Sequence, residues 1–171
     1  MPSTPNPMNR RNFIRATSAS LLLSSFSSYG FDFFANEKPK KVALIGTGWY
    51  GTGDLLRLIQ IANVEVVSLC DVDEHNLNIA ANLVAERQKN GKKPKLFSDY
   101  RKMLKLHQLD IVLIGTPDHW HALTCIDALK SGAHVYVQKP ISMDVIEGEA
   151  MVAAAKKYNK VVQVGTQRKS T

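Results

Sequence analysis

Residues 42–51 read Val42-Ala43-Leu44-Ile45-Gly46-Thr47-Gly48-Trp49-Tyr50-Gly51. Four apolar residues come first, as in a strand that is buried on both faces, and three glycines with the spacing GxGxxG follow at once. An amphipathic stretch over residues 51–61 then predicts a helix. A strand, a glycine turn and a helix in this order indicate an α/β fold.

The alternation of apolar runs and amphipathic stretches continues along the chain. Further strands are predicted at residues 65–70, 96–97, 110–115, 133–137 and 161–164, and further helices at 74–88, 98–106, 120–131 and 142–158. Runs such as Ile111-Val112-Leu113-Ile114 are apolar throughout, as parallel strands covered by helices on both faces must be. We therefore expect a doubly wound parallel six-stranded sheet of the Rossmann type over residues 36–171.

The spacing of the glycines indicates what the first turn binds. Gly46 would permit the tight turn, Gly48 would let a pyrophosphate approach the backbone, and Gly51 would let the helix pack closely on the strand. The free N–H groups at the start of the helix would hold the pyrophosphate. Because the motif follows a strand and opens a helix, it predicts a dinucleotide site.

Asp71 ends the second predicted strand, 71 − 46 = 25 residues beyond the first glycine. An acidic side chain about 20 residues on binds the ribose hydroxyls and repels a 2′-phosphate, so the expected cofactor is NAD rather than NADP. Asp73 is the alternative for this role, or it caps the following helix. Trp49 and Tyr50 either pack against the cofactor or seal the surface of the domain.

Two polar segments follow later strands. The fourth strand is followed by Gly115-Thr116-Pro117-Asp118-His119-Trp120-His121, and the fifth by Gln138-Lys139-Pro140. Since ligands bind outside the carboxyl ends of parallel strands, both segments should face the glycine turn. Lys139 at such a place suits proton transfer or the orientation of a hydroxyl, and the alternative is an ordinary solvated lysine.

The remaining reactive residues do not indicate a metal site or thiol chemistry. His119 and His121 lie two residues apart, but a zinc site needs three or four converging ligands, and the other histidines fall on different elements. Cys70 and Cys125 are expected to be small buried hydrophobes. No metal is therefore predicted.

The first 35 residues are interpreted as an export signal. Asn9-Arg10-Arg11-Asn12-Phe13-Ile14-Arg15 precedes a short apolar stretch that is diluted by serines, and no acidic residue occurs before Asp32. This pattern predicts a twin-arginine signal peptide and a periplasmic location, and the alternative is a cytoplasmic protein with a basic N-terminus. No stable membrane insertion is expected, because spanning a bilayer takes about 20 predominantly apolar residues.

Composition and charge narrow the remaining classes. The chain has 171 residues, 44% of them hydrophobic, which suits one domain with a packed core. Its net charge of 22 − 15 = +7 falls to 19 − 14 = +5 outside the first 35 residues. The remaining lysines cluster at predicted turns and helix ends without interleaved aromatic residues, so no nucleic-acid partner is expected.

Three segments together, GTGWYG, TPDHWHA and VYVQKPIS, resemble the Gfo/Idh/MocA family, named for glucose-fructose oxidoreductase and inositol dehydrogenase. The resemblance covers about residues 40–171. It implies an NAD(P)-binding domain, followed in that family by an α+β domain that supplies much of the substrate site. It also implies hydride transfer at a carbinol carbon of sugars or polyols, and a branch of the family uses the same chemistry to cleave glycosides.

The resemblance also implies roles for single residues. Carried over, the three glycines match the phosphate turn and Asp71 the ribose contact. Lys139 matches the lysine of a Glu-Lys-Pro motif, which positions substrate and assists proton transfer, but Gln138 stands where that motif usually has Glu, so the carboxylate charge is missing. Gln138 and Gln167 are expected to reach the cofactor crevice. The wall beside the nicotinamide is matched by Thr116, Pro117 and His121.

The family's C-terminal α+β domain is expected to be absent from this chain. The sequence therefore predicts the NAD-binding domain of an oxidoreductase that acts on sugars or polyols, in a truncated form. The alternatives are a catalytically idle NAD-binding module and the cofactor half of an NAD-dependent glycosidase. No oligomeric state is predicted, because family members often associate through the second domain.

Overall fold

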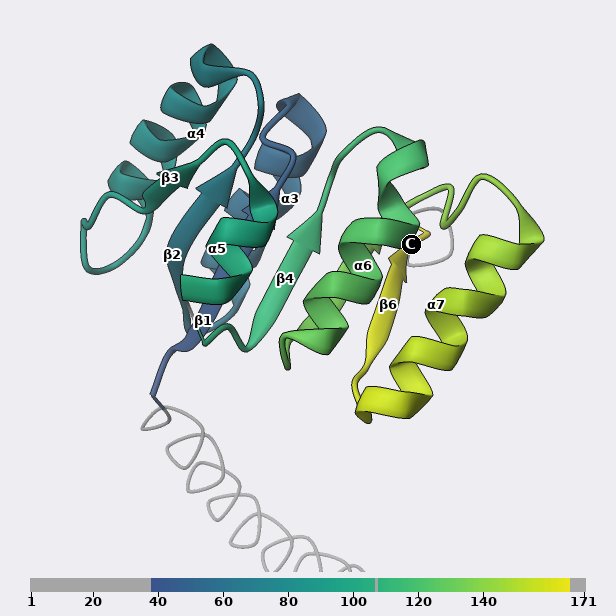
Figure 1. Ribbon diagram of the computed structural model, residues 1–171. Helices are drawn as coiled ribbons and strands as arrows, with labels where there is room; N and C mark the ends of the chain where they lie inside the picture. The colour runs from purple at the N-terminus through teal and green to yellow at the C-terminus, as the bar shows by residue number, and fades with distance from the viewer. Residues whose placement is uncertain (1–37, 107, 167–171) are drawn as a thin grey trace, which may run out of the picture. The chain divides into compact units, whose positions relative to one another are not determined.

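The computed structural model describes residues 38–106 and 108–166 (Figure 1). Six strands form one sheet in the order β3-β2-β1-β4-β5-β6, and every neighbouring pair is parallel. This order confirms the expected doubly wound sheet, whose direction of winding reverses between β1 and β4. The strands are β1 Lys40–Ile45, β2 Val64–Cys70, β3 Lys95–Phe97, β4 Ile111–Ile114, β5 His134–Gln138 and β6 Val162–Gly165.

Helices cover both faces of this sheet (Figure 1). α3 and α4 pack on one face, and α5, α6 and α7 pack on the other. A short 3-10 turn, η2, leads into α6. The helical elements are α3 Trp49–Ile61, α4 Glu74–Arg87, α5 Tyr100–Leu106, η2 Asp118–Trp120, α6 His121–Lys130 and α7 Val145–Tyr158.

The central strand β1 contributes to two separate cores. Leu44 packs with Leu55 of α3 in one core, whereas Ile45 packs with Met103 of α5 and Leu129 of α6 in the other. Successive side chains of a strand point to opposite faces, so a strand between two helical layers must be apolar at every position. The apolar run at the start of the motif is therefore a consequence of burial on both faces.

The expected elements are all present, and their ends differ from the predicted ones by at most three residues. The largest difference is at α7, which begins at Val145 instead of residue 142. Asp144 ends the preceding loop, because its side chain accepts a hydrogen bond from the backbone N–H of Glu147 at 2.8 Å. The helix of the glycine motif begins at Trp49, inside the motif, rather than at residue 51.

Two expectations fall outside the described residues. The export signal predicted for residues 1–35 and the cofactor contact predicted for Gln167 both lie there. Within residues 38–106 and 108–166, none of the helices combines the length and the apolar character that crossing a bilayer requires.

Candidate functional site

The glycine turn brings the ends of β1 and β4 against the start of α3. Gly46 has φ +91°, and a Cβ there would lie 2.6 Å from the backbone of Gly115 and Thr116. A Cβ on Gly51 would overlap the carbonyl oxygen of Gly46, and a Cβ on Gly115 would lie 2.8 Å from the Cα of Gly51. The tight turn predicted at Gly46 and the close packing of the helix predicted at Gly51 agree with this geometry. The sequence motif does not include Gly115, which meets them from another strand.

Gly48 differs from the other two glycines of the motif. Its φ of −58° suits any residue, and a Cβ there would meet nothing within 4 Å. The fold itself therefore does not require glycine at this position. The space that it leaves lies at the N-terminus of α3, where free N–H groups and the helix dipole favour an anion.

Asp71 binds the glycine turn from the end of β2. Its Oδ2 accepts hydrogen bonds from the backbone N–H of Thr47 at 2.6 Å and from Thr47 Oγ1 at 3.0 Å. Its Oδ1 accepts one bond, from the N–H of Asp73 at 3.0 Å. Asp73 itself caps α4, accepting from the N–H groups of His75 and Asn76. Of the two candidates for the ribose contact, Asp71 is the one that lines the pocket beside the turn.

This pocket has a volume of about 390 Å³, within the range of small-molecule sites. It lies where the carboxyl ends of β1 to β4 meet, at the point where the strand order reverses, which is the place that such sheets use for ligands. Thr116 and Pro117 line it, as expected for the segment after β4. Its other lining residues include Gly46, Gly48, Asp71, Asp99, Tyr100, Arg101 and Trp120.

An aromatic wall on this pocket was not anticipated from the sequence. The Arg101 guanidinium lies over the Tyr100 ring at 4.6 Å, and Trp120 meets the same ring edge-on at 6.5 Å. Tyr100 Oη donates to Asp127 Oδ2 at 2.9 Å, and burial together with this bond raises the pKa of Tyr100 to about 12. Residues 98–101 follow β3, so the rule that ligands bind at the carboxyl ends of strands would have found this wall.

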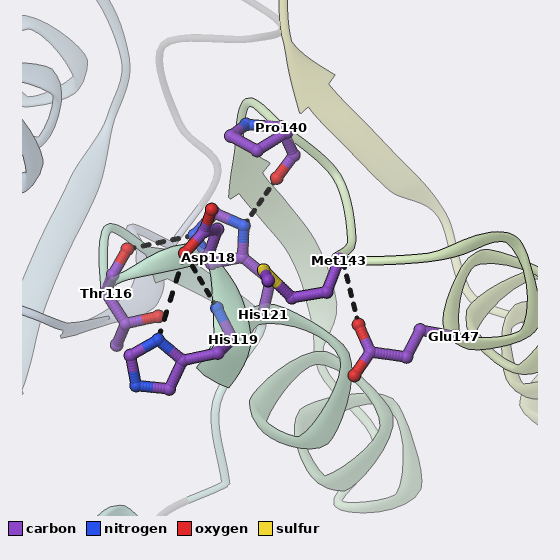
Figure 2. Close-up of polar contacts among 7 residues, drawn as sticks. All are labelled: Thr116, Asp118, His119, His121, Pro140, Met143 and Glu147. Carbon is purple, nitrogen blue, oxygen red and sulfur yellow. Dashed lines mark hydrogen bonds and ion pairs between the residues drawn. The ribbon is translucent and has the colours of Figure 1, made fainter.

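His121 joins the two loops that border the site (Figure 2). Its Nδ1 is 2.7 Å from the carbonyl oxygen of Pro140, and its Nε2 is 3.0 Å from that of Thr116. The side chain is 1% exposed. His121 therefore braces the loop after β4 against the loop after β5, and its contact with a nicotinamide stays a prediction.

The neighbouring His119 is exposed and contacts only Asp118 among the residues drawn in Figure 2. Among the described residues, no group of three or more histidines, cysteines or acidic residues is placed to hold a metal ion. Cys70 and Cys125 are buried, as expected, and burial raises the pKa of both thiols to about 12.

The segment after β5 lies against the start of α3. Lys139 is exposed, and its Nζ is 5.9 Å from the centre of the Tyr50 ring. Gln138 is buried, and its Oε1 accepts a hydrogen bond from the backbone N–H of Lys139 at 3.1 Å. The peptide bond between Lys139 and Pro140 is cis. Trp49 is 85% exposed and touches Tyr50 edge-on, so it does not seal the surface of the domain.

Comparison with known proteins gives a family and several relatives. Residues 40–166 match a family model described as an oxidoreductase family with an NAD-binding Rossmann fold. A glycosyl hydrolase family 109 protein from Shewanella woodyi is 32% identical over 124 residues, which are 70% of this chain and 26% of the relative.

Two solved structures are similar over 78% of this chain. One is a myo-inositol 2-dehydrogenase from Lactobacillus plantarum, with a TM-score of 0.67 and 27% identity. The other is the WlbA dehydrogenase from Chromobacterium violaceum in complex with NADH and UDP-GlcNAcA, with a TM-score of 0.70 and 26% identity. The aligned part makes up 38% and 37% of those chains, so this chain spans little more than a third of their length.

Proposed function

We propose a function for this chain as a member of the Gfo/Idh/MocA oxidoreductase family, of which it is the NAD-binding Rossmann domain. That function is to serve hydride transfer between a sugar or polyol carbon and nicotinamide. The observation that carries the proposal is the open space over Gly48. That space lies at the N-terminus of α3, beside the pocket at the point where the strand order reverses. Because a Cβ at residue 48 would meet nothing within 4 Å, the packing of the protein does not explain why this residue is glycine.

Each part of the site has a role in this function. The first turn of α3 would hold the pyrophosphate, because free N–H groups and the helix dipole attract anions. Asp71 would hold the adenosine ribose through its Oδ1, which accepts one bond from Asp73 and keeps acceptor capacity, whereas Oδ2 already accepts two bonds from Thr47. Bound NAD supplies the hydride acceptor. Lys139 would manage the proton of the substrate hydroxyl at its Nζ.

The names of the relatives support a sugar or polyol as the substrate class. One structural neighbour is an inositol dehydrogenase, and another was solved with NADH and a nucleotide sugar. The expected sites of substrate binding include residues that these relatives have and that this chain does not span. Turnover is therefore proposed only where such residues are also present, and residues 1–171 by themselves are expected to bind NAD without oxidising polyols.

The second candidate is the cofactor half of an NAD-dependent glycosidase. It is favoured by the similarity to the Shewanella woodyi protein, which is named as a glycosyl hydrolase. Both candidates need the same NAD site, so cofactor binding does not separate them. Joining this chain to the remaining part of each kind of relative and assaying polyol oxidation against glycoside cleavage would separate them.

The NAD site is tested by a matched pair of glycine substitutions. Gly48→Ala is expected to lower NAD affinity at least tenfold and to leave the melting temperature unchanged, because a Cβ there would meet no protein atom within 4 Å but would enter the space proposed for the pyrophosphate. Gly53→Ala, four residues after the first residue of the same helix, is the control, since a Cβ there would also meet nothing within 4 Å. It should retain NAD affinity and gain up to about 1 kcal/mol of helix stability.

Calorimetric titration and thermal unfolding provide the two measurements. Equal NAD affinity in Gly48→Ala and the parent chain would reject the placement of the pyrophosphate. No NAD binding to the folded parent chain would reject the cofactor role itself.

We also propose that the protein is exported by the twin-arginine route. The support is the pair Arg10-Arg11 before a short apolar stretch. Replacing both arginines by lysine keeps the charge and should stop export of a reporter fused after residue 37. Export that is unchanged in this variant would instead favour the cytoplasmic alternative.

A further inference from the structure

Two side chains of α3, one helical turn apart, contact the last residue of β5 and the residue that follows it. Tyr50 lies under Lys139, whose Nζ is 5.9 Å from the centre of the ring. Asp54 accepts a hydrogen bond at its Oδ2 from Nε2 of Gln138. Because residues i and i+4 lie on the same face of a helix, α3 presents both partners to this segment together.

Gln138 links Asp54 to the backbone of Lys139. Its side chain is buried, with 6% exposure, and both ends of the amide are used. Nε2 donates to Asp54, and Oε1 accepts from the N–H of Lys139 at 3.1 Å. An amide can do both at neutral pH, whereas an ionised carboxylate offers acceptors alone. A chain of two hydrogen bonds thus runs from a carboxylate on α3 to the lysine's own peptide group.

The sheet leaves room for this amide at Gly165 of β6. A Cβ on Gly165 would lie 2.9 Å from Gln138 Nε2 and 2.6 Å from Tyr136 Oη. Any larger residue at position 165 would displace one of these two side chains. The pairing of Gln138 with Asp54 is therefore supported from a second strand as well as from α3.

The carboxylate beside residue 138 belongs to Asp54 of α3. Asp54 has a side-chain exposure of 12%, and its Oδ1 lies 3.3 Å from Nη1 of Arg57. A glutamate at residue 138, as the resembling motif usually has, would bring a second carboxylate against Asp54, and adjacent carboxylates resist joint ionisation. Asp54 also lines a surface pocket between α3 and β5. The other titratable groups that line this pocket are Arg57 on α3, and His134 and Tyr136 on β5.

We propose that Asp54 is a positioning residue for Lys139. Through the Gln138 amide it holds the start of the segment that carries the lysine, and it supplies the charge that the motif usually has at residue 138. This inference rests on the proposed function, because Lys139 acts on a substrate only there. Asp54 lies on α3 outside the three sequence motifs, and none of those motifs links it to Lys139.

A charge exchange tests the pairing. Gln138→Glu is expected to unfold at a lower urea concentration than the parent chain at pH 7. Its deficit should shrink as the pH falls towards 5, because the folded state then binds a proton that relieves the carboxylate pair. The double variant Asp54→Asn/Gln138→Glu should regain the parent's midpoint, since amide and carboxylate have only exchanged places. A double variant no more stable than Gln138→Glu would overturn the pairing.

A second measurement follows the lysine directly and does not depend on Gln138→Glu. In Asp54→Ala, the backbone amide proton of Lys139 should move upfield in the NMR spectrum, because its acceptor is no longer held. Arg57→Ala is the control, since it removes the ion pair with Asp54 but keeps the bond to Gln138. An unmoved Lys139 amide in Asp54→Ala would overturn the positioning role.

Both measurements are made without cofactor, so they are independent of the proposed function. A parallel titration of the parent chain with NADH completes the test. Failure of NADH to bind would reject the proposed function, whereas the exchange and the amide shift decide the role of Asp54.

Discussion

Asp71 contributes both to the fold and to the site at the scale of a single residue. It accepts two hydrogen bonds from Thr47 and one from Asp73, so one carboxylate ties the glycine turn to the end of β2. The same carboxylate lines the pocket. A residue with both roles is best tested by measuring stability and affinity together.

Asp71→Ala is expected to weaken NAD binding by about 10- to 100-fold, because hydrogen bonds to a charged group contribute about 1.5–3 kcal/mol and 1.4 kcal/mol is a factor of ten. The preference for NAD over NADP should narrow as well, because the charge that repels a 2′-phosphate is removed. Calorimetric titration with both dinucleotides measures these effects.

Asp73→Ala is the matched control for this substitution. It removes the cap of α4 and should cost about 1 kcal/mol of stability while NAD affinity stays close to that of the parent chain. If Asp73→Ala weakened NAD binding as much as Asp71→Ala does, the prediction that Asp71 rather than Asp73 holds the ribose would be wrong.

At the scale of elements, the site depends on how two loops are held together. The loops after β4 and β5 come from neighbouring strands, and His121 at the start of α6 bridges their carbonyl groups (Figure 2). Both contacts are part-buried, and the imidazole N–H supplies a hydrogen-bond donor to the backbone where the strands end. The position of Lys139 beside α3 therefore depends on α6 as well as on Asp54.

His121→Phe is expected to lower the free energy of unfolding by about 1 to 3 kcal/mol, because the buried imidazole and its hydrogen bond between the two loops are lost. Urea unfolding measures this loss. His119→Ala, two residues earlier and exposed, should change stability by no more than about 0.5 kcal/mol. Equal stabilities of the two variants would contradict the bracing role.

At the scale of the whole molecule, two apolar cores on opposite faces of the sheet stabilise the part of the chain that the structure describes. Three titratable groups with raised pKa values lie in or beside the core that α5, α6 and α7 cover. Burial is the main cause for each of them, and Tyr100 also donates to Asp127. The groups are Cys70, Cys125 and Tyr100.

The stability of the chain is therefore expected to fall as the pH rises from about 9 towards 12. The unfolded chain releases thiol protons near pH 9.0 and the phenol proton near pH 10.0, whereas the folded protein keeps all three up to about pH 12. In this window the folded state binds more protons, so each increase in pH favours unfolding. Urea midpoints at pH 7, 9 and 10.5 measure the trend.

Cys125→Ala provides the control for the alkaline trend. This thiol owes its raised pKa to burial alone, so its removal should make the fall between pH 9 and 10.5 shallower. A stability that does not change between pH 7 and 10.5 would contradict the burial of these groups.

Much of the fold and part of the site could be predicted from the sequence. The apolar runs predict the strands, because a strand between two helical layers must be apolar on both faces, and GxGxxG marks the turn between β1 and α3. The turn at Gly46 and the close packing at Gly51 also follow from local spacing. Element ends were less certain, because capping by residues such as Asp144 depends on side-chain geometry.

The sequence by itself determined the order and type of the elements, the parallel sheet, the glycine turn and the family, because these follow from periodicity and from motifs within a few residues. Only the tertiary structure decided which residues meet: Gly115 against Gly51, Tyr100 beside the pocket, His121 between two loops, and Asp54 with Gln138. The physical reason is that these contacts join residues from different elements, and only the packing of those elements against the sheet brings them within hydrogen-bond distance or van der Waals contact.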